Sequence, residues 1–211
     1  NEQATFNHMM KYGYRVGLAH IESLDFRKMV IKADDVGRRD IFQLDEYDRL
    51  VRYLRTYGSK RACPDEDERK ELKLIRDAIL IASNTMLRVG ELWQLKWKDI
   101  ISIDDVFDEN EKRISLVTIN VRAEISKVRK SRRIPVRGGD YVKRVKARAQ
   151  HTNPEDFVFC AIGKNTKVRA HTWYDHWKVI MNAIDIPDYV ERQLTWYSLR
   201  HFGITCRIRA K

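Results

Sequence analysis

The sequence contains little cysteine, proline or glycine and no long hydrophobic run. Its 211 residues include four prolines, nine glycines and three cysteines, Cys63, Cys160 and Cys206. Three widely separated cysteines exclude a disulfide framework and a zinc site with the usual ligand spacing, which favours a reducing, cytoplasmic compartment. No apolar stretch approaches the roughly 18 residues that span a bilayer, and no signal peptide is visible. We therefore expect no membrane partner.

Charge and apolar content indicate a folded protein with a polyanionic partner. Hydrophobic residues make up 43% of the chain and aromatic residues 10%, which is enough to build a core. Lysine and arginine total 41 against 30 aspartates and glutamates, a net charge of +11. Such an excess favours nucleic acid or an anionic membrane surface, and with no membrane segment we expect nucleic acid.

The chain divides into a short first part, a linker and a main domain. Residues 1–24 predict the end of an amphipathic helix that closes at Gly17. Residues 25–40 have no sustained periodicity and are expected to be a linker. The main domain is expected over residues 41–211.

Hydrophobic spacing predicts the elements of the main domain. Helical patterns cover residues 43–57, 66–84, 141–149 and 173–184, and Ser198 is expected to cap a last helix. Three β-prone runs, at 101–107, 114–121 and 133–136, are separated by polar turns. We expect a mostly helical α+β domain with a small three-stranded antiparallel sheet.

Arg88 is an unusual charge in an apolar stretch. It follows the predicted end of one helix and precedes Val89, where a second helix begins. Isolated arginines are mostly solvated, so the simplest interpretation is a surface residue between two core helices. Two later stretches, residues 126–136 and 194–205, favour a functional role instead.

Residues 122–137 form a strongly basic segment on an expected β-hairpin. They contain one acid, Glu124, and a net charge of +6 in 16 positions. The basic residues are Arg122, Lys127, Arg129, Lys130, Arg132, Arg133 and Arg137. A hairpin of this charge fits a DNA groove, and Arg122, Arg129, Lys130, Arg132 and Arg133 are the predicted DNA contacts. The alternative is a solvated charged turn, but the alternating Ile125, Val128 and Ile134 are unusually apolar for a free loop.

Three stretches, taken in order, resemble the catalytic domain of tyrosine recombinases, the phage integrase family: NTMLRVGELWQLKWKDI (84–100), SKVRKSRRIPV (126–136) and LTWYSLRHFGIT (194–205). The resemblance implies that Arg88 and Arg200 grip the scissile phosphate. It also implies a catalytic lysine at the start of the basic turn. By motif position this is Lys127, with Lys130 as the alternative.

The resemblance further implies a site-specific DNA recombinase. Such a protein cleaves and rejoins duplex DNA through a 3′-phosphotyrosyl intermediate, with no metal or other cofactor. It implies a homotetramer on paired DNA sites, in the cytoplasm of a bacterium or a phage-infected host cell. Residues 1–24 would then be the remnant of a helical core-binding domain.

The sequence departs from the family pattern near Arg200. The position three residues before this arginine is usually His or Lys, but here it is Tyr197. A phenol with a pKa near 10 donates a hydrogen bond to phosphate but is a poor general base at neutral pH. His201 matches the family's second histidine, and we expect it to brace the helix or an acidic partner such as Glu91.

No residue of the chain matches the family's nucleophilic tyrosine, which follows the Leu-Arg-His motif by a few tens of residues. The chain is therefore expected to end before that tyrosine and to be inactive in recombination by itself. A non-catalytic DNA-binding protein that retains the integrase fold is the alternative function. A type IB topoisomerase, which shares the chemistry, fits the motifs less well.

Overall fold

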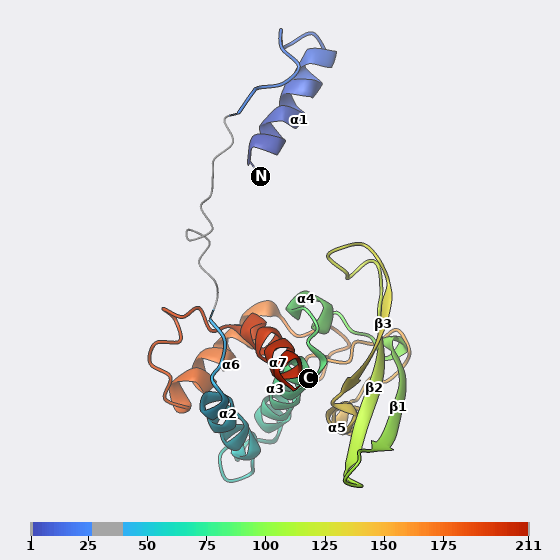
Figure 1. Cartoon of the computed structure of the whole chain (residues 1–211), viewed down its shortest axis with the longest axis vertical. Helices are drawn as coiled ribbons and strands as arrows, with labels where there is room; N and C mark the ends of the chain where they lie inside the picture. Colours follow the sequence, from blue (N-terminus) through green and yellow to red (C-terminus); the bar gives the residue numbers. More distant parts are fainter. Residues whose placement is uncertain (1, 27–39, 211) are drawn as a thin grey trace. The chain divides into compact units, whose positions relative to one another are not determined.

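The computed structural model describes residues 2–26 and 40–210, which belong to two separate units (Figure 1). The division between the units falls between residues 38 and 39, within the predicted linker. Most of that linker, residues 27–39, lies outside the described residues. Across the described ranges, none of the helices combines the length and apolar character that crossing a membrane requires.

The first unit holds helix α1, Glu2–Arg15. None of its residues is buried, and Phe6, Met9 and Tyr12 are each more than half exposed. The helix ends where the sequence predicted, just before Gly17, which adopts a left-handed φ of 74°. The apolar side chains of α1 are thus exposed, and the assignment of this unit to a larger helical domain remains a prediction.

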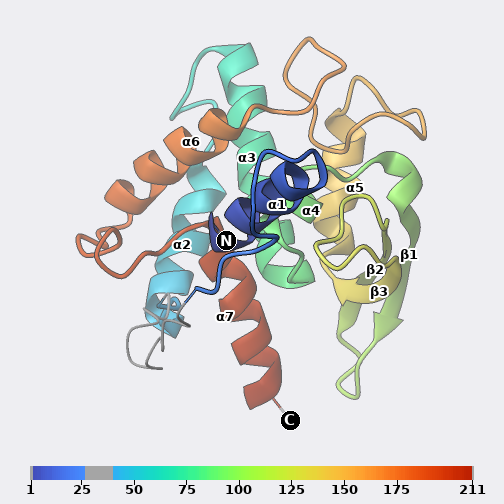
Figure 2. The same ribbon diagram turned by 90° about the horizontal axis from the view of Figure 1, so that it is seen from above.

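The helices of the second unit match the predicted ones closely. They are α2 (Leu44–Thr56), α3 (Glu66–Thr85), the single-turn α4 (Val89–Leu92), α5 (Gly139–Arg148), α6 (Ala170–Ala183) and α7 (Trp196–Arg209). Helix α3 is central, with α2, α6 and α7 on one side and α5 with the sheet on the other (Figure 2). Its residues Ile75, Ala78 and Ile79 are fully buried. The C-terminal end of this buried helix leads directly to Arg88.

The predicted antiparallel sheet is confirmed. Its strands are β1 (Ile100–Phe107), β2 (Arg113–Val121) and β3 (Arg132–Arg137), in the order β1-β2-β3. Alternate residues of β2, Val117, Ile119 and Val121, are fully buried, as expected for a sheet with one covered face. Residues 122–131, which connect β2 to β3, form a long turn at the end of the sheet (Figure 1).

The predicted cap of the last helix is wrong by one turn. Thr195, not Ser198, is the N-cap of α7, and its hydroxyl accepts a hydrogen bond from the Tyr197 N–H (3.3 Å). Ser198 is fully buried in the first turn, and its hydroxyl accepts from the Thr195 N–H (3.1 Å). Both hydroxyls belong to one capping box, so the spacing of Thr and Ser could have placed the helix start correctly.

Helix α7 packs closely on the end of α3 through Gly203. A Cβ atom at this position would fall against the carbonyl oxygen of Ser83 and lie 2.9 Å from Cγ of Met86. Glycine therefore allows the backbones of the two helices to approach each other.

We expect Gly203→Ala to destabilise the protein by about 1–3 kcal/mol, the usual range for overpacking. Alanine normally stabilises a helix interior by about 1 kcal/mol relative to glycine. Here the clash with a carbonyl oxygen outweighs that gain, because a backbone atom has no alternative rotamer. Gly90→Ala is the control, since a Cβ atom added there would have open space within 4 Å. Urea unfolding of both variants measures the effect, and equal stabilities would contradict the packing described.

Candidate active site

Arg88 lies where the chain turns sharply between two helices. Met86, just after α3, adopts a left-handed φ of 52°, and Arg88 is extended and forms the N-cap of α4. The backbone N–H of Arg88 donates to Oε2 of Glu91 (3.0 Å), and its Nη1 donates to Oε1 of the same carboxylate (3.1 Å). Two bonds to one carboxylate thus fix the Arg88 side chain and the start of α4 relative to each other.

Glu91 is almost fully buried, with 1% of its surface exposed. Its Oε2 also accepts a hydrogen bond from Nη2 of Arg132 (2.7 Å), at the start of β3. Burial by itself raises the pKa of Glu91, but the hydrogen bonds from Arg132 and Arg88 outweigh it, so the pKa lies below its usual value. Glu91 is therefore a carboxylate at neutral pH, shared by two arginines.

Arg200, in the second turn of α7, converges on the same place. Its Nη1 donates a hydrogen bond to the carbonyl oxygen of Met86, 114 residues away in sequence. Burial lowers the pKa of Arg200, and the nearby positive charge of Arg88 lowers it further. Two neighbouring guanidinium groups repel each other, and an anion bound between them would relieve this repulsion.

An open hollow of about 530 Å³ lies beside these groups. Its walls come from α4, the turn after β2, α6 and the start of α7. Among its lining residues are Arg88, Glu91, Trp93, Ser126, Lys127, Tyr174 and Tyr197. Lys127 lines the hollow, whereas Lys130 is not among its lining residues, which favours Lys127 as the lysine that faces a bound group.

Two buried polar atoms in the wall of the hollow lack hydrogen-bond partners within the described part of the chain. They are Nε1 of Trp93 and Oγ of Ser126. Buried polar groups in folded proteins are nearly always hydrogen-bonded.

Tyr197 and His201 lie together on α7. Their ring centroids are 5.1 Å apart, at an angle of 55°. Tyr197 also lines the hollow, so the residue in the position of the usual His or Lys faces the same space as Arg88 and Lys127. His201 lies one turn further along, where its ring braces that of Tyr197.

The basic residues of the turn differ in their surroundings. Arg129, Lys130 and Arg133 are exposed. Arg122 instead donates from Nε to both carboxylate oxygens of Asp99 (2.9 and 3.0 Å) and from Nη2 to the Gln94 carbonyl (3.0 Å). Its guanidinium is held within the protein, which is not where the predicted DNA contact would place it.

Arg132, like Arg122, binds a buried carboxylate that the sequence pattern did not predict as its partner. The signal was present in β3, where exposure alternates along the strand. Arg132 lies on the same side as the buried Val136, whereas Arg133 lies on the exposed side. A two-residue periodicity therefore separates the inward arginine from its outward neighbour.

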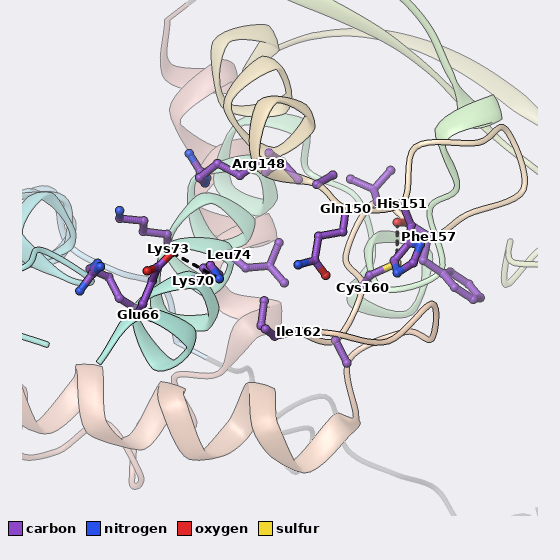
Figure 3. Close-up of a pocket in the computed structure, with 15 residues that line it drawn as sticks. Glu66, Lys70, Lys73, Leu74, Arg148, Gln150, His151, Phe157, Cys160 and Ile162 are labelled. Carbon is purple, nitrogen blue, oxygen red and sulfur yellow. Dashed lines mark hydrogen bonds and ion pairs between the residues drawn. The ribbon is translucent and has the colours of Figure 1, made fainter. Parts of the chain in front are cut away.

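A second cavity, of about 320 Å³, lies at the other half of α3 (Figure 3). It is bounded by the first turns of α3, the end of α5 and residues 149–162. Leu74, Phe157 and Ile162 contribute apolar walls, and Lys70, Lys73 and Arg148 contribute charge. None of the predicted site residues lines it. Within the described ranges, no group of His, Cys, Asp or Glu is placed to hold a metal ion.

Among the solved structures with the same fold are recombinases in complex with DNA. The Tn1549 transposon integrase (residues 82–397), bound to circular intermediate DNA, aligns with 15% identity and a TM-score of 0.59 over all of this chain and 66% of its own. The XerH site-specific recombinase in a post-cleavage complex aligns with 16% identity and a TM-score of 0.63 over 92% of this chain and 49% of its own. In a pre-cleavage complex it aligns with 16% identity and a TM-score of 0.57 over 95% of this chain and 52% of its own. The chain thus spans about half to two thirds of the chains in these structures and has an integrase catalytic-domain fold.

The sequence also matches a family model, that of the phage integrase family, over residues 42–205. The chain therefore belongs to the phage integrase family of tyrosine recombinases. A search of curated proteins found no significant match. The matched region contains Arg88, Lys127 and Arg200, the residues that the motifs singled out.

Proposed function

We propose that the protein is a site-specific DNA recombinase that cleaves and rejoins DNA through a 3′-phosphotyrosyl intermediate. The observation that carries the proposal is that Arg88 and Lys127 line one hollow. Arg200 is not among the lining residues, but it is hydrogen-bonded to the carbonyl oxygen of Met86, two residues before Arg88. Two arginines and a lysine together can bind a DNA phosphodiester, which is an anion. The nucleophilic tyrosine is assigned to no residue of this chain.

The two arginines would bind the non-bridging oxygens of the scissile phosphate. A guanidinium offers a planar fork of donors that matches two phosphate oxygens. As the tyrosine oxygen forms its bond to phosphorus, negative charge builds on those oxygens in the pentacoordinate transition state. Donors that are already held in place stabilise that charge most. Arg88 is held by its bond to Glu91, and Arg200 is held by its bond to the Met86 carbonyl.

Lys127 would act as the general acid. When the bond between phosphorus and the 5′ oxygen breaks, the departing oxygen takes a proton from the ammonium group. Tyr197 faces the same hollow and would donate a hydrogen bond from its phenol to the phosphate. Rejoining reverses these steps, with a 5′-hydroxyl from the partner duplex attacking the phosphotyrosyl bond, on paired sites held by four copies of the protein.

Covalent trapping tests the proposal directly. The whole encoded protein, with any coding sequence that continues beyond residue 211, would be mixed with a duplex nicked near the cleavage site. Loss of the short 5′-hydroxyl fragment prevents rejoining, so a protein–DNA adduct should accumulate on a denaturing gel. A protein that binds the duplex but forms no adduct would favour the second candidate, a non-catalytic DNA-binding protein. Tyr197 is the observation that favours this alternative, because the family usually has His or Lys there.

We expect residues 1–211 to bind duplex DNA with weak sequence preference and a steep salt dependence. The exposed Arg129, Lys130 and Arg133 lie at the turn between β2 and β3, where they would contact phosphates. With about four to six phosphate contacts in total, raising the salt concentration fourfold should reduce affinity by roughly two to three decades. Fluorescence anisotropy with a labelled duplex measures this slope.

The control for the salt slope is Arg61→Ala, an exposed arginine in the loop between α2 and α3. That loop lies at the opposite end of the second unit from the turn between β2 and β3 (Figure 1). Arg129→Ala should weaken binding and reduce the slope by about 0.9, whereas Arg61→Ala should change neither. Affinity that is flat between low and moderate salt would contradict an electrostatic interface.

A further inference from the structure

Arg132 belongs to the basic segment by sequence but contacts the active site in the structure. Its Nη2 donates to Oε2 of Glu91 at 2.7 Å, a short, charge-assisted bond between residues 41 apart. The Arg132 side chain is 31% exposed, and the Glu91 side chain is 1% exposed. Most of this ion pair is therefore shielded from solvent, unlike the exposed surface pairs that contribute little.

The carboxylate of Glu91 accepts hydrogen bonds from residues of two elements, Arg88 at the start of α4 and Arg132 in β3. Oε1 accepts from Nη1 of Arg88 (3.1 Å), and Oε2 accepts from both the Arg88 backbone N–H (3.0 Å) and Arg132 (2.7 Å). Arg132 pairs with Val121 where the strands diverge, so it closes the base of the turn that carries Lys127. One buried carboxylate therefore joins α4 to the base of this turn.

We infer that Arg132 is a positioning residue that couples the turn between β2 and β3 to the phosphate-binding arginine Arg88. This inference rests on the proposed function. While the turn is docked, Arg132 shares the negative charge of Glu91, so Arg88 keeps donors available for the phosphate, and Lys127 lies at the hollow. When the turn moves away, Glu91 loses one of its two cations, so the position in which it holds Arg88 for the phosphate changes. The same displacement removes the general acid, so cleavage requires a docked turn.

Arg132→Gln tests this coupling in the whole encoded protein. We expect duplex affinity and its salt slope to stay within about twofold, because Arg132 faces Glu91 and not DNA. The single-turnover cleavage rate at saturating DNA should fall about 10- to 100-fold, the usual effect of a small misplacement of a reacting group. Arg132→Lys should restore part of the rate, since only one donor of Arg132 contacts Glu91. Arg133→Gln, on the exposed side of β3, should instead weaken binding and reduce the salt slope.

Arg144→Gln is the matched structural control. Nη2 of Arg144 donates to Oδ1 of Asp77 (2.6 Å), a fully buried carboxylate that Arg76 and Arg148 also contact. Arg132→Gln takes one cation from Glu91, and Arg144→Gln takes one cation from Asp77. Because both carboxylates are buried and shared by several arginines, the two losses of thermal stability should be similar. Only Arg132→Gln should slow cleavage, and a similar slowing by Arg144→Gln would reduce the effect to general destabilisation and overturn the coupling.

A second measurement does not depend on cleavage. In residues 1–211, the ¹⁵N–¹H signal of the Arg88 side chain should shift in Arg132→Gln and stay unchanged in Arg133→Gln and Arg144→Gln. If the Arg88 signal is unmoved in Arg132→Gln, or if this variant loses DNA affinity as Arg133→Gln does, the coupling is wrong. Failure of the wild-type protein to cleave would reject the proposed function, and the Arg88 signal would still decide whether Arg132 positions Arg88.

Discussion

Replacing Arg88 or Arg200 with alanine is expected to slow DNA cleavage by the whole encoded protein about 10²- to 10³-fold. In the proposed mechanism each change removes a donor aimed at the charge that develops on the phosphate, and such a donor typically contributes about 3–4 kcal/mol. Duplex affinity should stay within several-fold, because most of the proposed phosphate contacts are made by the exposed cations of the turn between β2 and β3. Lysine should restore little activity, since a single ammonium does not reproduce a planar fork of donors.

Single-turnover cleavage of a nicked duplex and anisotropy binding assays separate the two effects. Arg200 also donates to the Met86 carbonyl at the end of α3, so its alanine variant needs an unfolding measurement beside the kinetics. Gly203→Ala is a useful reference there, because it loosens the same contact between α3 and α7 without removing a charge. A near wild-type cleavage rate in either alanine variant would show that the phosphate binds elsewhere.

Lys127→Ala is expected to be slow on ordinary DNA and to recover on a substrate whose bridging 5′ oxygen is replaced by sulfur. A general acid matters only while the leaving group is poor, and a thiolate leaves without protonation. The variant should keep its duplex affinity. Arg129→Ala, two residues along the turn, should weaken binding and show no sulfur rescue.

The sulfur substrate also decides between the two candidate lysines. Lys127 lines the hollow beside Arg88, and Lys130 lies three residues further along the turn. Cleavage rates of each alanine variant on the oxygen and sulfur substrates give the comparison. Rescue of Lys130→Ala without rescue of Lys127→Ala would reassign the general acid to Lys130 and shift the motif alignment of the turn.

Local sequence patterns were sufficient to predict most of the helices and strands. The α3 helix, the break after Thr85 and the three strands follow from hydrophobic spacing and turn residues, which act over a few positions. The same locality explains the error at α7. Thr195 and Ser198 are both good caps, and the prediction considered Ser198 by itself and missed the capping box that it forms with Thr195.

The sequence by itself determined the identities of the phosphate-binding candidates, Arg88, Lys127 and Arg200, because their motifs are short and continuous. The tertiary structure alone decided how they meet and which basic residues face inward. Arg122 and Arg132 lie in one run of cations with Arg129 and Lys130, yet Asp99 and Glu91, 23 and 41 residues away, hold the first two. An ion pair with a buried carboxylate depends on which elements the fold brings together. The sequence of a basic segment therefore does not show which of its residues have such a distant partner.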